Sequence, residues 1–137
     1  MEGLLLGLRV LHSLGRWLVL LAALGALSIL GRAAGGHPPS PRGERLVRLY
    51  PLLLDIQVTL GILLWLGQRL AAVPLTSVQI FHPVWGLLAA FAAHGAAAFR
   101  SQGNPARSRG ILAAYSLSLL LILIALATVG AFPFGRR

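Results

Sequence analysis

The sequence predicts an all-α integral membrane protein, an up-down four-helix bundle that forms a single domain over residues 1–137. Three observations predict this fold. The chain is 57% hydrophobic and only 11% charged, whereas soluble domains have roughly one quarter charged residues. It contains four apolar stretches of about 20 residues, the length that crosses a hydrocarbon core of roughly 30 Å. The connections between them are short, which makes successive helices antiparallel neighbours.

The expected spans cover residues 10–31, 49–68, 80–99 and 110–131. The first connection, GRAAGGHPPSPRGER, is rich in Gly, Pro and Arg and is expected to be a polar loop. A competing interpretation makes the first span a secretory signal peptide, because a short apolar core over residues 17–30 follows Arg9 and Arg16. The apolar approach that begins at Leu4 favours a retained helix.

The second and third connections, QRLAAVPLTS and RSQGNPARSRG, carry prolines and helix-stop residues. Pro83 leaves two starts open for the third helix. It disfavours helical backbone at His82, so the helix either begins there or begins earlier. In the second case Thr76 and Gln79 form a capping box and Pro83 lies in the first turns.

Arginine placement predicts the orientation of the bundle. We call the end that holds the N-terminus end A and the opposite end B. End B holds Arg32, Arg42, Arg45, Arg48, Arg100, Arg107 and Arg109, and end A holds Arg9, Arg69, Arg136 and Arg137. The excess predicts that end B is cytoplasmic and that both termini are extracytoplasmic. Because the arginines cluster in these short loops, the net charge of +9 is not taken to indicate nucleic-acid binding.

Two histidines are expected at one level near end A. His12 precedes Arg32 by twenty residues and His82 precedes Arg100 by eighteen, and each helical residue advances about 1.5 Å. Two neutral imidazoles from different helices can ligate one b-type haem. The chain has no cysteine, so any redox role needs a bound cofactor of this kind.

Nearby residues suit a haem. Gly15 and Gly86 are small enough to lie against a macrocycle, as are Ala89 and Ala90. Arg16 lies one turn from His12 on the same helix face and is a candidate cation for the propionates. The alternative is that the histidines and Arg16 only extend toward the interface or bond a backbone carbonyl.

A second polar layer is expected roughly 10 Å inside end B, formed by Asp55, His94 and Tyr115. These side chains are expected to point inward, with His94 as the partner of a buried Asp55. They either join the helices by hydrogen bonds or form a protonatable pair for quinone chemistry or proton uptake. Gln57, two residues beyond Asp55, is expected on a different helix face.

The runs LHSLGRWLVLLAAL, DIQVTLGILLW, FHPVWGLLAAFAAH and the final FPF resemble small bacterial four-span membrane proteins of a cytochrome b-like family. The resemblance covers most of the chain. It implies haem b and electron transfer, with His12, Arg16 and His82 at the haem site and with Gln57 and Gly61 in a helix-two signature. It also implies the inner (cytoplasmic) membrane of a bacterium. Where this chain has Asp55, some relatives are expected to have histidine.

The sequence therefore favours a membrane b-type cytochrome that binds one haem near the extracytoplasmic face and exchanges electrons with quinone or a redox membrane partner. The first alternative is a cofactor-free structural or accessory subunit of a larger membrane complex. The second is a small transporter that uses the Asp55, His94 and Tyr115 layer, and four helices would need an oligomer for transport.

Overall fold

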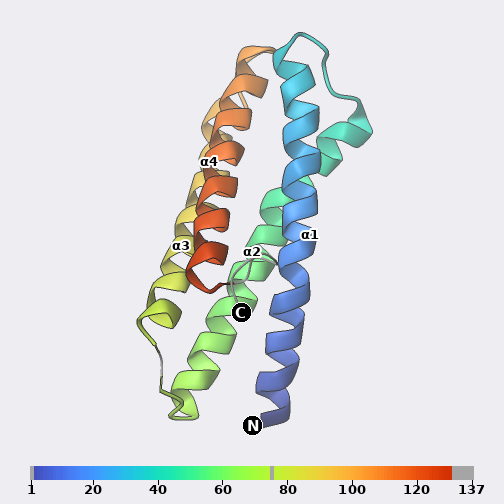
Figure 1. The fold of residues 1–137 in the computed structure, drawn as a ribbon. Coiled ribbons are helices and arrows are strands. Elements are labelled where there is room, and N and C mark those ends of the chain that lie inside the picture. Colours follow the sequence, from blue (N-terminus) through green and yellow to red (C-terminus); the bar gives the residue numbers. More distant parts are fainter. Residues whose placement is uncertain (1, 75, 131–137) are drawn as a thin grey trace.

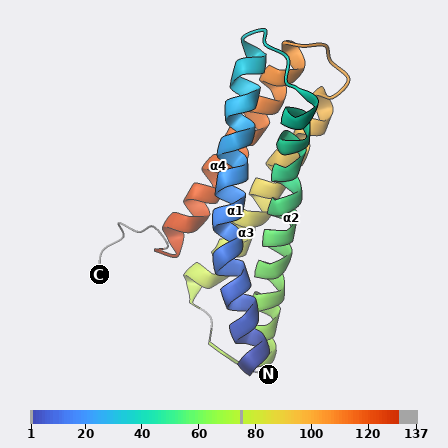
Figure 2. The ribbon, with the colours of Figure 1, turned by 90° about the vertical axis from the view of Figure 1, so that its right-hand side faces the viewer.

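The computed structural model describes residues 2–74 and 76–130, and the fold within them is a bundle of four long helices (Figure 1). They are α1 (Glu2–Ala34), α2 (Pro41–Leu70), α3 (Ser77–His94) and α4 (Ala106–Thr128), and a short 3-10 helix, η1 (Gly95–Phe99), extends α3. Figures 1 and 2 show that α1 and α3 run in one direction and that α2 and α4 run in the other. All four are long and apolar enough to cross a membrane. The predicted all-α membrane bundle is confirmed.

Helix α2 begins at Pro41, well before the predicted start of the second span. Ser40 caps it, since its hydroxyl accepts a hydrogen bond from the Gly43 amide at 3.2 Å. Pro41 occupies the first turn, where its missing N–H costs nothing, and Glu44 adds a favourable charge near the helix N-terminus. The prediction of a polar loop through residue 45 is therefore wrong, and the loop is confined to residues 35–40.

Helix α3 begins at Ser77 with the capping box of Thr76 and Gln79, and Pro83 lies inside the helix. The second of the two predicted starts is therefore confirmed. The predicted end of the last span at residue 131, the FPF motif, Arg136 and Arg137 lie outside the described residues.

Small residues let the helices pack closely. Fully or almost fully buried alanines lie on two helices and on η1: Ala23, Ala26, Ala33, Ala89, Ala93 and Ala96. In a bilayer, lipid tails are as apolar as the helix surfaces, so close backbone packing replaces hydrophobic burial as a source of stability. Leucines cover the outside of the bundle, as lipid contact requires.

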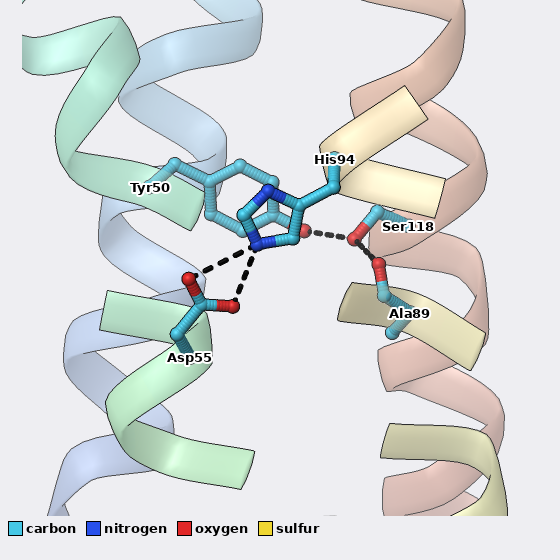
Figure 3. A network of polar contacts seen from close by, with 5 residues as sticks. All are labelled: Tyr50, Asp55, Ala89, His94 and Ser118. Atoms are coloured by element: carbon cyan, nitrogen blue, oxygen red, sulfur yellow. Dashed lines mark hydrogen bonds and ion pairs between the residues drawn. The ribbon is translucent and has the colours of Figure 1, made fainter. Parts of the chain in front are cut away.

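A buried hydrogen-bonded chain crosses the bundle from α2 to α3 through α4 (Figure 3). Ser118 donates to the Ala89 carbonyl at 2.7 Å, so the Tyr50 hydroxyl, 2.6 Å from the Ser118 hydroxyl, acts as donor to it. Tyr50 and Ser118 have no exposed surface. The chain satisfies both hydroxyls where water is absent. No sequence pattern predicted this chain of hydrogen bonds.

Tyr115 compensates for a proline inside α2. Pro51 has no N–H, so the carbonyl of Val47, four residues earlier, loses its helical partner. The Tyr115 hydroxyl donates to that carbonyl at 3.2 Å, and its ring packs edge-on against Tyr50 with centroids 4.9 Å apart. Tyr115 therefore completes the backbone hydrogen bonding of α2.

The substitution Tyr115→Phe should lower the free energy of unfolding by about 1–3 kcal/mol, because it leaves the buried Val47 carbonyl without a donor. In a Pro51→Ala background the restored N–H can serve that carbonyl, so the cost should fall by about 1 kcal/mol or more. Denaturation of the wild-type protein, the two single variants and the double variant in bicelles by dodecyl sulfate measures both costs. Equal costs in the two backgrounds would contradict the compensation of Pro51 by Tyr115.

Candidate functional site

The rings of His12 on α1 and His82 on α3 lie close together near end A. Their centroids are 6.2 Å apart and their planes are nearly perpendicular, at 85°. The prediction that these two histidines lie at one level is confirmed. Both are partly buried within the bundle.

His12 is fixed by Gln57 of α2. Its Nδ1 lies 3.2 Å from the Gln57 carbonyl oxygen, and the Gln57 side-chain amide donates to the His12 carbonyl at 2.7 Å. The same amide nitrogen is 3.1 Å from Nδ1. One ring nitrogen cannot donate to the carbonyl and accept from the amide at the same time, because it does the first only with a proton and the second only without one. The tautomer with the proton on Nδ1 bonds the Gln57 carbonyl and leaves Nε2 free to bind a metal.

Two glycines permit this interlock between α1 and α2. A Cβ on Gly61 would lie 2.9 Å from His12 Cε1, so the histidine ring occupies the space that a side chain there would need. A Cβ on Gly15 would likewise collide with the side-chain oxygen of Gln57. On each helix, therefore, a glycine leaves room for a polar side chain of the other helix. Gly15 acts here in helix packing and is not part of the cavity wall.

His82 is fixed by the end of α4. Its Nδ1 lies 3.0 Å from the carbonyl oxygen of Ala125, which belongs to the last turn of a helix that ends at Thr128. Carbonyls in a last turn lack intrahelical donors, and His82 and the Thr128 hydroxyl both bond this one. Because a carbonyl only accepts, His82 also holds its proton on Nδ1 and leaves Nε2 free.

A cavity of about 630 Å³ contains both histidines. Its polar wall includes Arg9, Arg16 and Trp65, and its apolar wall includes Val19 and Leu54. Gly86 also lines it, as expected for a residue against a flat ligand. The volume lies within the range of roughly 300–1,000 Å³ that is typical of cofactor and small-molecule sites.

Three buried polar atoms have no hydrogen-bond partner within the part of the chain that the structure describes. They are Arg16 Nε, Gln57 Oε1 and Trp65 Nε1, and all three residues line this cavity. An unsatisfied buried polar group costs about 1–3 kcal/mol. Two of the atoms are donors, which favours a ligand that brings acceptor oxygens to this wall.

The predicted second polar layer of Asp55, His94 and Tyr115 forms only in part. Asp55 on α2 and His94 on α3 do pair, with His94 Nε2 at 2.9 and 3.0 Å from the two carboxylate oxygens (Figure 3). Their side chains are 44% and 56% exposed, so the predicted inward, buried position is wrong. Tyr115 does not join them, because it bonds Val47. Gln57 lies on another face of α2 than Asp55, as predicted, and its side chain bonds α1 there.

The described residues hold no group of three or more histidine, cysteine, aspartate or glutamate side chains that could bind a metal ion. Within those residues, His12 and His82 bring two imidazoles together, fewer than the three or four protein ligands of an ordinary zinc site. A pair of this kind suits a metal that arrives with its other ligands already in place.

No family model, curated protein sequence or solved structure matches the chain. The resemblance to cytochrome b-like proteins stays a prediction, and the functional argument depends on the geometry of the site.

Sequence reasoning missed Trp65 and Ala125 at this site. The Ala125 contribution comes from a backbone carbonyl, which no residue type reveals. Trp65 had a signal in the sequence, because it lies one turn beyond Gly61 on α2 and that spacing places both on one helix face.

The substitution Gly61→Ala should displace the His12 ring and lower stability by about 1–3 kcal/mol, the usual cost of overpacking. Gly86→Ala is the matched control on the cavity wall. Its Cβ would lie 3.7 Å from Val58, an ordinary contact, and alanine favours helix by up to about 1 kcal/mol. Thermal unfolding in detergent distinguishes the two variants. Equal stability of both would show that His12 does not need Gly61.

Proposed function

We propose that the protein is a membrane b-type cytochrome that holds one haem between His12 and His82 and transfers electrons. The observation that carries this proposal is the spacing of the two rings, whose centroids are 6.2 Å apart. A metal–imidazole bond is about 2.0 Å and a ring centre lies about 1 Å behind its nitrogen, so two imidazoles across one metal have centroids roughly 6 Å apart.

The hydrogen bonds of both histidines support the same ligand role. Metal-bound histidines almost always donate their second ring N–H to a carbonyl, carboxylate or water, which sets the tautomer and raises ligand basicity. His12 has the Gln57 carbonyl and His82 has the Ala125 carbonyl for this purpose. The carbonyl bonds also fit the alternative in which each histidine only bonds a backbone carbonyl, so the proposal depends on the spacing of the two rings.

The remaining walls fit the rest of the group. Arg9 and Arg16 would neutralise the two propionate carboxylates, and Arg16 Nε and Trp65 Nε1 are buried donors that have no acceptor among residues 2–74 and 76–130. The apolar wall, with Val19, Leu54 and Ile122, excludes water.

A bound haem would supply one-electron chemistry, because its iron changes oxidation state without a change of ligands. The residues of the chain bind and orient it. Gln57 holds His12, and the end of α4 holds His82. The positive charge of the nearby guanidinium groups would contribute to the reduction potential of the haem. Quinone or a redox membrane partner is the proposed donor or acceptor.

The orientation belongs to the same proposal. The arginine excess at end B supports a cytoplasmic location for that end, and the resemblance to the cytochrome b-like family supports the inner membrane of a bacterium. Both termini and the histidine cavity then face the extracytoplasmic side.

The protein purified in detergent after expression with adequate haem should be coloured. A reduced-minus-oxidised absorption spectrum should contain the Soret and α bands of a haem with two axial histidines. A colourless protein under these conditions would overturn the proposal and favour the cofactor-free accessory subunit.

The substitutions His12→Ala and His82→Ala should each abolish the spectrum or convert it to that of a five-coordinate haem, because each removes one axial ligand. His37→Ala, in an exposed loop, and His94→Ala, in the pair with Asp55, are matched controls that should keep the spectrum. Absorption spectra of the four variants at equal haem supply test this. Full retention by a His12 or His82 variant would exclude that residue as a ligand.

A further inference from the structure

A second cavity, of about 360 Å³, lies at end B, at the opposite end of the bundle from the histidines. Three arginines line it, Arg48 of α2, Arg100 beside η1 and Arg107 of α4, together with one carboxylate, Glu44. The cavity wall therefore carries three positive charges and one negative charge. Its deeper part is apolar and includes Leu30, Val47 and Ile111.

Glu44 pairs with two of these arginines through long contacts. Arg48 and Arg107 each approach one of its oxygens at 3.4 Å, whereas charge-assisted hydrogen bonds are about 2.7–2.9 Å long. The chain has two other acidic residues, Glu2 and Asp55. Glu2 begins α1 at end A, and Asp55 is paired with His94. Three guanidinium groups against one carboxylate leave the cavity wall with a net positive charge, which favours an anion from outside the chain.

The chemistry of the cavity specifies the missing anion. Guanidinium groups bind phosphate oxygens through parallel N–H bonds, and basic pockets between membrane helices bind anionic lipid headgroups. An apolar floor below the arginines suits an acyl chain. We propose that this cavity binds the phosphodiester headgroup of an anionic glycerophospholipid, with Arg100 and Arg107 as its main contacts.

Two possible roles of Glu44 predict opposite effects of its removal. If Glu44 serves to hold Arg48 and Arg107 in place, its removal should damage the site. If it competes with the lipid phosphate, its removal should strengthen binding. The isosteric substitution Glu44→Gln separates these cases because it removes the charge and keeps the size.

Native mass spectrometry of the full chain, titrated with phosphatidylglycerol and with phosphatidylcholine, tests the proposal. Phosphatidylglycerol should bind at least about fivefold more tightly, and Arg100→Gln or Arg107→Gln should each weaken it about fivefold, as expected for about 1 kcal/mol per arginine. Glu44→Gln should tighten it by a similar factor. Arg45→Gln is the matched control, because Arg45 lies at the same end outside the cavity wall.

Circular dichroism and elution volume establish that each variant is folded before binding is compared. Equal binding of the two lipids would overturn the proposal, as would unchanged or weaker binding by Glu44→Gln or a loss in Arg45→Gln equal to that in Arg107→Gln. Inorganic phosphate is the remaining arm of the test. Displacement of phosphatidylglycerol by millimolar phosphate would assign the site to a free anion and overturn the lipid part of the proposal.

Discussion

The close crossing of α1 and α2 is the contact on which the histidine cavity depends. Gly15 and Gly61 remove two side chains from this crossing, and His12 and Gln57 occupy the space. Hydrogen bonds then join the two helices through main-chain carbonyls as well as side chains. Lipid does not drive helices together as water does, so contacts of this kind have to hold the bundle. They also fix the direction in which His12 faces, and the cavity between α1 and α3 follows from it.

Backbone carbonyls without helical donors explain much of the polar chemistry of the interior. Pro51 frees the Val47 carbonyl for Tyr115, and the end of α4 frees the Ala125 carbonyl for His82. In a dry interior each such carbonyl needs a donor from elsewhere in the chain. Polar side chains therefore have two roles that look alike in the sequence. Tyr115 only completes a helix, whereas His82 completes one and keeps a second nitrogen for chemistry.

Counting residues along helices predicted depth well and direction poorly. It placed His12 beside His82 and Asp55 beside His94, because every helix advances by the same distance per residue. Depth does not fix rotation about the helix axis, so Tyr115 at the level of Asp55 faces another partner. Because rotation about the helix axis was unknown, the exposure of the Asp55–His94 pair was not predicted either.

Other features depended on signals that were present in the sequence but were given another meaning. Ser40, Pro41 and Glu44 form a helix start, although the surrounding Gly, Pro and Arg residues favoured a loop. Pro51 indicates that a carbonyl one turn earlier needs a donor, and Tyr115 supplies it. The unsatisfied atoms of Arg16 and Trp65 could not be predicted, because they depend on which partners the folded interior leaves out of reach.

The Asp55–His94 pair also has a consequence for how the chain enters the membrane. An aspartate at the centre of a helix costs roughly 2.5–3.5 kcal/mol on insertion, and α2 alone has no histidine to share that charge. The partner arrives with α3, after the loop that ends at Thr76. When both side chains are charged, their opposite charges cancel, and when both are neutral, neither carries a charge. In either case the paired helices carry no net charge at this position. This arrangement favours the entry of α2 and α3 into the bilayer together, as a helical hairpin.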